Sequence, residues 1–358
     1  MPDSALRRWT LGSRKARTWG FLALTLAAAA VFVTGSCGSL PKGELEQRLH
    51  QLGKNTALED LQRVAFRADL GEGPQDLELI YHHAPAQITA LKPGDPVPIV
   101  LVHGTPSTLF SWTELIYGLP ASEGRAGFEG LNSAHDVYAI EIIGHGIAPG
   151  DASTYGFERC ARFVTAALHA LELDRVHLVG SSYGGEFAWR AALNEPERIE
   201  SLVLLDSSGV RRRDQDWLSE EILMRENSLA KIGWRLNSRD RIESALVPHF
   251  RELPPDRVEE FFLVCENAHN WKAMVDLARD ENGERESELV SMQPPTLLLW
   301  GAEDVAYPVE YYGQRFADAI PRAELVILPN TGHYPHEERP GEVVRILTAF
   351  LENQRAAQ

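Results

Sequence analysis

A glycine-flanked serine is the first feature of the sequence that could do chemistry. Residues 180–184 read Gly-Ser-Ser-Tyr-Gly, so Ser182 has a glycine two positions before it and another two positions after it. An apolar run, VHLVG, leads into this motif and a segment of helical period leaves it, which predicts a tight strand-turn-helix connection that presents the serine hydroxyl. The spacing selects Ser182 over Ser181, because Ser181 would need glycine at position 179 and has Val179 there. We therefore predict that Ser182 is a nucleophile.

A serine hydroxyl is a weak nucleophile until a base takes its proton, so the motif predicts an acid and then a histidine further along the chain. Asp304 and His333 stand in that order, and each follows an apolar run that is typical of a strand, TLLLWG and ELVILP respectively. We expect His333 to be the base and Asp304 to orient it. Asp206, which follows another such run, and Glu303 are the alternative acids.

A metal site is the competing interpretation of the histidines. His336 lies three residues after His333, but the sequence around this pair offers no cluster of carboxylates or cysteines to complete a metal site. We expect neither a metal nor another cofactor.

The negative charge of a tetrahedral intermediate needs hydrogen-bond donors. The tetrapeptide His103-Gly104-Thr105-Pro106 directly follows the apolar run IVLV. A loop there can donate a backbone N–H, and the N–H after the nucleophile provides a second donor. We assign Thr105 and Tyr183 as the main-chain donors and expect His103 to pack within the loop.

The elements that would position these residues are short apolar runs that alternate with segments of helical period. Eight runs predict strands, and the last six are continuously apolar, as in parallel strands covered on both faces. They begin at Val64, Leu77, Ile99, Asp136, Val176, Leu202, Thr296 and Glu324. This alternation predicts an α/β fold with a mostly parallel eight-stranded sheet flanked by helices.

The interval from residue 211 to residue 295 interrupts this alternation between the sixth and seventh strands. It contains no clear strand, and its apolar residues fall at helical spacing. We expect a helical cap over the site, with a core formed by residues 61–210 and 296–358. Its aromatic residues predict either the interior of the cap or the wall of an apolar substrate pocket; they are Trp217, Trp234, Phe261, Phe262 and Trp271.

From Ile99 to its end the chain resembles the capped α/β-hydrolases. The resemblance rests on HGTP, on Gly144-His145-Gly146, on GSSYGG, on GAED and on GHYPHEERP, which occur in the family's order. The sequence departs from the family at Glu141-Ile142-Ile143, where Asp-x-Pro is usual, and we expect a displaced loop there. The resemblance implies the α/β-hydrolase fold with a helical cap between strands six and seven.

The reaction must be inferred from the site, because this architecture supports many chemistries. A serine nucleophile argues against reactions like those of epoxide hydrolases and haloalkane dehalogenases, which use aspartate at the same position. We favour hydrolysis of a carboxylic ester, thioester or lactone that has an apolar portion, through an acyl-enzyme on Ser182. The alternatives are a carbon–carbon bond hydrolase, which commonly has asparagine where Ser181 stands, an imino-type peptidase, and a non-catalytic binding protein.

The first 36 residues predict an export signal. Five basic residues precede an uncharged apolar run of 15 residues, Trp19 to Val33, which is shorter than the roughly 20 residues of a membrane-spanning helix. Gly35-Ser36-Cys37 resembles the lipobox of bacterial lipoproteins, which implies a lipid anchor at Cys37, a spacer over 37–60 and a location in the bacterial cell envelope. Cleavage near Ser36 with plain secretion, and an uncleaved short anchor, are the alternatives.

Charge and cysteine content exclude other classes of protein. The 358 residues have a net charge of −16, and without the first 36 residues they have 30 basic and 50 acidic residues, a net charge of −20. Such a surface repels phosphate backbones, so we expect no nucleic-acid partner. With three cysteines the fold cannot be stabilised by many disulfides. Cys160 and Cys265 are expected to be buried thiols, although a bridge between them is the alternative.

Overall fold

The computed structural model describes residues 47–48, 61–87, 97–122, 126–150, 153–213, 239–254, 256–266 and 268–356. The predicted signal (1–36), Cys37 and most of the predicted spacer lie outside these residues, as do Trp217 and Trp234. Within the described ranges, no helix combines the length and the apolar character needed to cross a membrane.

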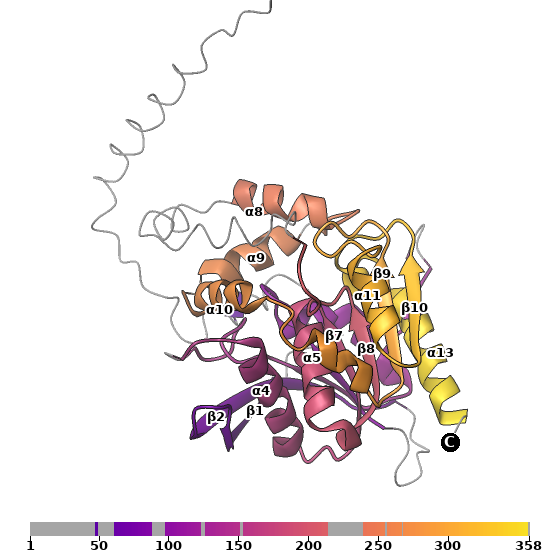
Figure 1. The fold of residues 1–358 in the computed structure, drawn as a ribbon. Coiled ribbons are helices and arrows are strands. Elements are labelled where there is room, and N and C mark those ends of the chain that lie inside the picture. The colour runs from indigo at the N-terminus through magenta and orange to yellow at the C-terminus, as the bar shows by residue number, and fades with distance from the viewer. Residues whose placement is uncertain are drawn as a thin grey trace, which may run out of the picture. The chain divides into compact units, whose positions relative to one another are not determined.

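An eight-stranded sheet forms the centre of the fold (Figure 1), with the strand order β1-β2-β6-β3-β7-β8-β9-β10. The strands are β1 (Gln62–Asp69), β2 (Pro74–Ala84), β3 (Ile99–Val102), β6 (Val137–Ile140), β7 (Val176–Ser181), β8 (Ile199–Leu205), β9 (Thr296–Gly301) and β10 (Ala323–Leu328). Pairing is parallel among six of the strands, namely β3, β6, β7, β8, β9 and β10, whereas β2 is antiparallel to both β1 and β6. The predicted mostly parallel eight-stranded sheet is therefore confirmed.

Helices lie between the strands, as the alternating pattern predicted. The α-helices are α3 (Thr113–Tyr117), α4 (Phe157–Ala170), α5 (Tyr183–Asn194), α8 (Arg239–Leu246), α9 (Arg257–Glu266), α10 (Ala268–Asp280), α11 (Tyr312–Ala319), α12 (Pro335–Glu338) and α13 (Pro340–Ala356). Short 3-10 helices are η1 (Leu109–Trp112), η2 (Leu131–Ser133), η3 (Pro196–Arg198), η5 (Val247–His249) and η6 (Glu286–Ser291). The sequence analysis missed a small antiparallel pair, β4 (Gly118–Leu119) with β5 (Phe128–Glu129).

Both faces of the sheet are covered, which explains why its parallel strands are apolar at nearly every position. On one face α4, α5 and α11 pack against strand residues such as Val102, Leu178 and Leu298. On the other face α3 and α13 pack against residues such as Leu101 and Val179, which alternate with the first set along the strands. Two hydrophobic layers thus fix the sheet and, with it, the positions of the strand ends.

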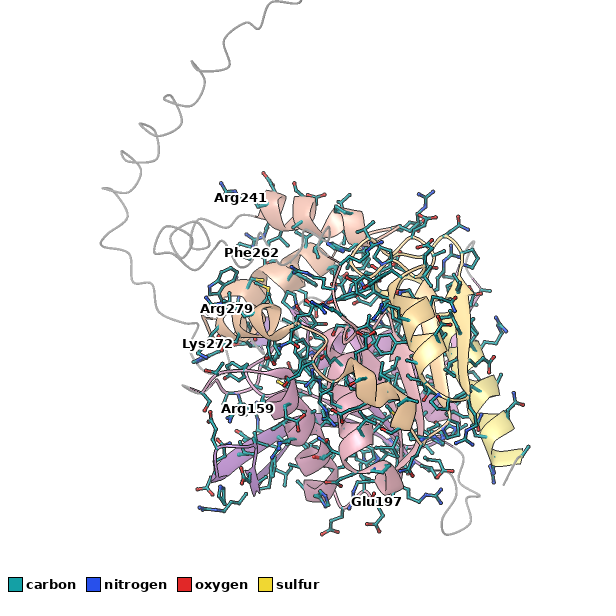
Figure 2. All side chains as sticks on the ribbon, in the orientation of Figure 1. Arg159, Glu197, Arg241, Phe262, Lys272 and Arg279 are labelled. Carbon is teal, nitrogen blue, oxygen red and sulfur yellow. The ribbon has the colours of Figure 1, made fainter. Side chains whose placement is uncertain are left out.

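In the part of the predicted 211–295 segment that the structure describes, between β8 and β9, the regular elements are the helices α8, η5, α9, α10 and η6. Its helices α8 and α9 share a separate small hydrophobic cluster, composed of Ile242, Leu246, Phe250, Phe261 and Cys265. Figure 2 labels Phe262, which projects from α9 and whose ring lies 4.2 Å from the Arg239 guanidinium carbon. Phe261 belongs to the small hydrophobic cluster and is therefore part of the interior of the segment.

The two cysteines inside the described part of the chain are both buried, and neither forms a disulfide. Cys160 belongs to the cluster around α4 and α5, and Cys265 to the small cluster of the 211–295 segment. The bridge between them is therefore absent, in agreement with the buried-thiol interpretation.

Candidate active site

The turn at Ser182 is as sharp as the motif predicted. Ser182 lies between the end of β7 and the start of α5 with φ 55° and ψ −124°, a left-handed backbone conformation that is rare for a residue with a side chain. A Cβ on Gly180 would lie 2.3 Å from the carbonyl oxygen of Gly184, and one on Gly184 would lie 2.3 Å from that of His103. Only glycine fits at both positions, which is the steric reason for the motif.

Three polar side chains from three loops meet at this turn. The Oγ of Ser182 lies 3.0 Å from Nε2 of His333, and Nδ1 of His333 lies 2.8 Å from Oδ2 of Asp304. All three residues are buried, at 6%, 4% and 4% exposure. The structure thus brings together the predicted nucleophile, base and acid in one hydrogen-bonded chain.

The carboxylate of Asp304 is held at both oxygens. Its Oδ1 accepts hydrogen bonds from the backbone N–H groups of Ala306 (2.8 Å) and Tyr307 (3.1 Å), which leaves Oδ2 for His333. Burial alone would raise the pKa of Asp304, but the imidazole of His333 and these hydrogen bonds hold that pKa below its ordinary value. Asp304 is therefore ionised at neutral pH.

Asp206, the alternative acid, lies beside Asp304 at the end of β8. It is fully buried, and its Oδ1 accepts a hydrogen bond from the backbone N–H of Gly301 at 2.9 Å. Burial and the nearby charge of Asp304 raise the pKa of Asp206 well above its ordinary value. Close approach of two carboxyl groups disfavours ionisation of both, and these directions favour the charge on Asp304 and the proton on Asp206. Glu303, the other alternative, is exposed.

Two carboxyl groups do cluster at His333, although no cluster that could complete a metal site was predicted there: one oxygen of Asp206, one oxygen of Asp304 and one ring nitrogen of His333 lie within 4.8 Å of one another. Both ring nitrogens of His333 are engaged in the contacts to Asp304 and Ser182. In this arrangement His333 has no nitrogen left for a metal. His336 is buried against Trp112, with ring centroids 4.3 Å apart, and so has a packing role.

The predicted oxyanion loop lies against the nucleophile. A Cβ on Gly104 would lie 2.9 Å from Cβ of Ser182, so the loop can pass this close only with glycine at that position. Thr105 is the next residue, and its Oγ1 is buried and has no hydrogen-bond partner among the described residues. Tyr183 is the first residue of α5, where the backbone N–H has no partner within the helix. The structure thus places Gly104, the residue before Thr105, against Ser182, and Tyr183 directly after it.

His103 packs within the loop, as predicted. His103 is fully buried. Its Nε2 accepts a hydrogen bond from the backbone N–H of Ile142 at 3.2 Å, and its Nδ1 forms a hydrogen bond with the carbonyl oxygen of Gly104 at 2.8 Å. Glu141, at the departure from the family pattern, is also fully buried and accepts the backbone N–H of Leu109 at 3.0 Å. This carboxylate ties the strand end of β6 to the segment that follows the oxyanion loop.

A buried charged cluster joins α9 to two loops of the site and was missed by the sequence analysis. Arg257 is fully buried, forms ion pairs with Glu260 (2.8 Å) and Glu337 (2.9 Å), and donates to Oγ of Ser107 at 3.2 Å. Thr108 also donates to Glu260, at 3.0 Å. Glu337 lies in α12, which follows the loop that carries His333. The 211–295 segment therefore contacts this part of the chain, called the base loop, as well as the oxyanion loop. A surface helix shows the same alternation of charges, so no sequence signal distinguished this cluster.

The same segment also touches the base directly. The carbonyl of His249 accepts the backbone N–H of His333 at 2.7 Å. Phe250 stacks on Tyr334, with ring centroids 4.5 Å apart. The position of His333 therefore depends on a contact from η5.

His145 gives a prediction for the pH dependence of stability. It is buried, and burial, with His103 nearby, lowers the pKa of His145 to about 3. The unfolded chain binds a proton here below its pKa of about 6.5, whereas the folded chain does not until about 3. Stability must therefore fall as the pH falls through this window. Acidification from pH 7 to pH 5 should cost about 2 kcal/mol through this residue.

Urea unfolding of the wild type and of His145→Gln at both pH values measures this term. The substitution should reduce the pH dependence by about that amount, whatever constant loss of stability it causes. An identical pH dependence in the two proteins would contradict the prediction.

Comparisons with known proteins identify the family of the chain. Residues 99–346 match the family model described as "Alpha/beta hydrolase family". The chain is 28% identical over 272 residues to the uncharacterized hydrolase YugF of Bacillus subtilis, a match that covers 71% of this chain and 89% of that protein. It is 24% identical over 275 residues to 2-hydroxy-6-oxo-2,4-heptadienoate hydrolase of Pseudomonas putida, which covers 71% and 88%.

Solved structures with the same fold include a membrane phospholipase A described as a bacterial virulence factor, with TM-score 0.66, 25% identity, and coverage of 94% of this chain and 98% of that one. The N-acyl homoserine lactone degrading enzyme Est816 has TM-score 0.58, 26% identity, and coverage of 76% and 97%. An esterase from Thermogutta terrifontis has TM-score 0.65 at 21% identity, with coverage of 82% and 99%. These similarities show that the eight-stranded architecture is the α/β-hydrolase fold.

Proposed function

Because the chain belongs to the alpha/beta hydrolase family, we propose that it is a serine hydrolase that cleaves a carboxylic ester through an acyl-enzyme on Ser182. The observation that carries the proposal is the continuous chain of hydrogen bonds from Asp304 through His333 to Ser182. Such a chain activates a hydroxyl that is unreactive at its ordinary pKa.

In the proposed mechanism, Oγ of Ser182 attacks the ester carbonyl carbon while Nε2 of His333 takes the hydroxyl proton. The carbonyl oxygen becomes an oxyanion, which accepts hydrogen bonds from the backbone N–H groups of Thr105 and Tyr183. The carbon–oxygen bond to the alcohol then breaks, and the alcohol leaves with the proton from His333. Water repeats these steps on the acyl-enzyme and frees the acid, while Asp304 stays ionised and stabilises the imidazolium.

The 211–295 segment serves, in this proposal, as a cap that excludes water and contacts the acyl portion of the substrate. Its contacts with the oxyanion loop through Arg257 and with the base loop through His249 support this role. Two of the similar structures are a phospholipase A and a lactone-degrading enzyme, which favours an ester or lactone with an apolar portion as the substrate. Hydrolysis of a thioester would proceed through the same acyl-enzyme reaction.

We further propose export to the bacterial cell envelope and a lipid anchor at Cys37. The motif at Gly35-Ser36-Cys37 supports this location. A substrate dissolved in a membrane would then be within reach of the site. Metabolic labelling with a fatty-acid analogue, lost in Cys37→Ser, tests the anchor.

Labelling of the purified full-length chain with a fluorophosphonate, followed by peptide mapping, tests the catalytic proposal. The probe should modify Ser182, and His333→Ala should abolish the modification. Substrate class is then decided by a series of esters from acetyl to palmitoyl, beside 2-hydroxy-6-oxo-2,4-heptadienoate and a prolyl anilide. Turnover of the esters supports the proposal, and exclusive turnover of the dienoate or the anilide would replace it. A folded protein without labelling would favour a non-catalytic binding protein.

A further inference from the structure

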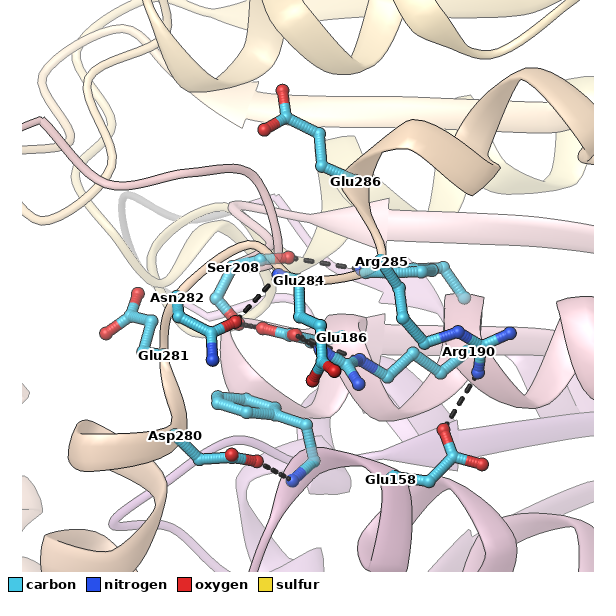
Figure 3. Close-up of polar contacts among 12 residues, drawn as sticks. Glu158, Glu186, Arg190, Ser208, Asp280, Glu281, Asn282, Glu284, Arg285 and Glu286 are labelled. Atoms are coloured by element: carbon cyan, nitrogen blue, oxygen red, sulfur yellow. Dashed lines mark hydrogen bonds and ion pairs between the residues drawn. The ribbon is translucent and has the colours of Figure 1, made fainter.

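Glu281 lies in the connection between α10 and η6, and its neighbours in the chain anchor that connection to the core. Oδ2 of Asp280 accepts the backbone N–H of Phe157 at 2.8 Å, at the start of α4, and Arg285 pairs with Glu158 at 2.8 Å. Figure 3 shows Glu281 on the opposite side of this connection from the Arg285–Glu158 pair. Both ends of the connection are therefore tied down, which limits where the Glu281 side chain can reach.

Each oxygen of the Glu281 carboxylate accepts a hydrogen bond from a tyrosine. The hydroxyl of Tyr183 donates to Oε2 at 2.9 Å, and the hydroxyl of Tyr307 donates to Oε1 at 2.8 Å. Tyr183 and Tyr307 are buried, at 6% and 3% exposure. Burial and the charge of Glu281 raise the pKa of both phenols well above its ordinary value, so both remain donors. Hydrogen bonds of this kind, to an ionised acceptor, are roughly twice as strong as neutral ones.

The two tyrosines belong to different parts of the proposed catalytic machinery. Tyr183 directly follows Ser182 and would donate its backbone N–H to the oxyanion. Tyr307 donates its backbone N–H to Oδ1 of Asp304, and its ring centroid lies 5.5 Å from that of His333. One carboxylate thus joins the nucleophile turn to the acid loop.

We infer that Glu281 is a positioning residue, which holds Tyr183 and Tyr307 so that the oxyanion N–H and the Asp304 carboxylate keep their places relative to Ser182. The inference rests on the proposed serine-hydrolase function. Glu281 acts through the two tyrosines rather than on the substrate, so its loss should lower kcat and leave KM nearly unchanged. Because Glu281 belongs to the 211–295 segment between β8 and β9, the reaction also depends on this segment.

Glu281→Gln should lower kcat about 10-fold to 100-fold, because small misplacements of catalytic groups have effects of that size. Glutamine offers one oxygen acceptor, so one phenol loses its acceptor. Glu284→Gln is the matched control: it removes the same charge from an exposed position of the same connection and should leave kcat unchanged.

The experiment measures kcat and KM of the full-length chain with an ester, together with the rate of fluorophosphonate labelling and the thermal midpoint. The double variant Tyr183→Phe/Tyr307→Phe retains both rings but lacks both hydroxyls. It should show the same fall in kcat, and adding Glu281→Gln to it should cause no further fall, since the contacts are already absent.

A kcat of Glu281→Gln equal to that of the Glu284→Gln control would overturn the inference. So would a loss of kcat that merely follows the loss of folded protein, or full additivity with the tyrosine variants. Absence of Ser182 labelling in the wild type is a different outcome, because it would overturn the proposed function and this inference with it.

Discussion

Replacing Ser182 with alanine is expected to lower kcat for ester hydrolysis by about 10⁵-fold to 10⁶-fold. The substitution removes the only atom that would bond to the substrate carbonyl, and neither His333 nor the oxyanion donors can replace it. The residual rate would come from water that attacks a substrate still held and polarised by the site. Steady-state kinetics on the purified full-length chain measure the effect.

The same substitution should change the free energy of unfolding by less than about 1 kcal/mol. Alanine retains the Cβ, so it meets the φ of 55° at the turn as serine does. Ser181→Ala is the matched control, since it removes a hydroxyl one residue earlier, at the end of β7, and should leave kcat within about 3-fold. A folded Ser182→Ala protein with undiminished esterase activity would refute the assignment of the nucleophile.

Asp304→Asn is expected to lower kcat by about 10⁴-fold, while Asp206→Asn should cost about 10-fold or less. The first substitution leaves His333 without an ionised partner at 2.8 Å, so the imidazole can adopt the wrong tautomer and its charged form is no longer stabilised. The second replaces a carboxyl group whose pKa is raised by burial and by the charge of Asp304 with a neutral amide of the same shape.

Comparing the two variants decides which carboxyl group orients the base. Groups from several elements face this pair: His333 from the loop after β10, His249 from η5 and Glu338 from α12. Rate profiles from pH 5 to pH 9 would show whether either variant also shifts the titration of the base. An Asp206→Asn protein as impaired as Asp304→Asn would mean that Asp206 orients His333.

The positions of the strands could be predicted because each contains a short run of strand-like character, which is continuously apolar in the last six and mixed with polar residues in β1 and β2. Every one of the eight predicted runs is a strand of the sheet, and the continuously apolar six are the parallel ones. The pair β4 and β5 was missed because its strands are two residues long each, too short to show any period. An alternation of apolar and polar residues shows which face of a strand is buried, and a strand of two residues is too short to show such an alternation.

The predicted site residues came together for a related reason. Ser182, Asp304 and His333 were predicted from their places after strands, and parallel strands bring their carboxyl ends to one edge of the sheet. Asp304 was preferred as the acid from the sequence, but Asp206 stayed an alternative, because both residues follow apolar strands. Their difference arises from burial and from their hydrogen bonds, which exist only in the folded chain.

The α/β architecture, the strand-turn-helix around Ser182 and the predicted order of nucleophile, acid and base could be read from the chain, since each depends on local spacing and on the alternation of apolar and polar residues. Folding alone shows that the pKa of Asp304 is held low, that Arg257 is buried between two carboxylates, and that Glu281 joins Tyr183 to Tyr307. These features depend on contacts between residues that are distant in the chain, and on the desolvation that such contacts produce. Residue type and spacing do not directly encode these long-range contacts or the desolvation that accompanies them.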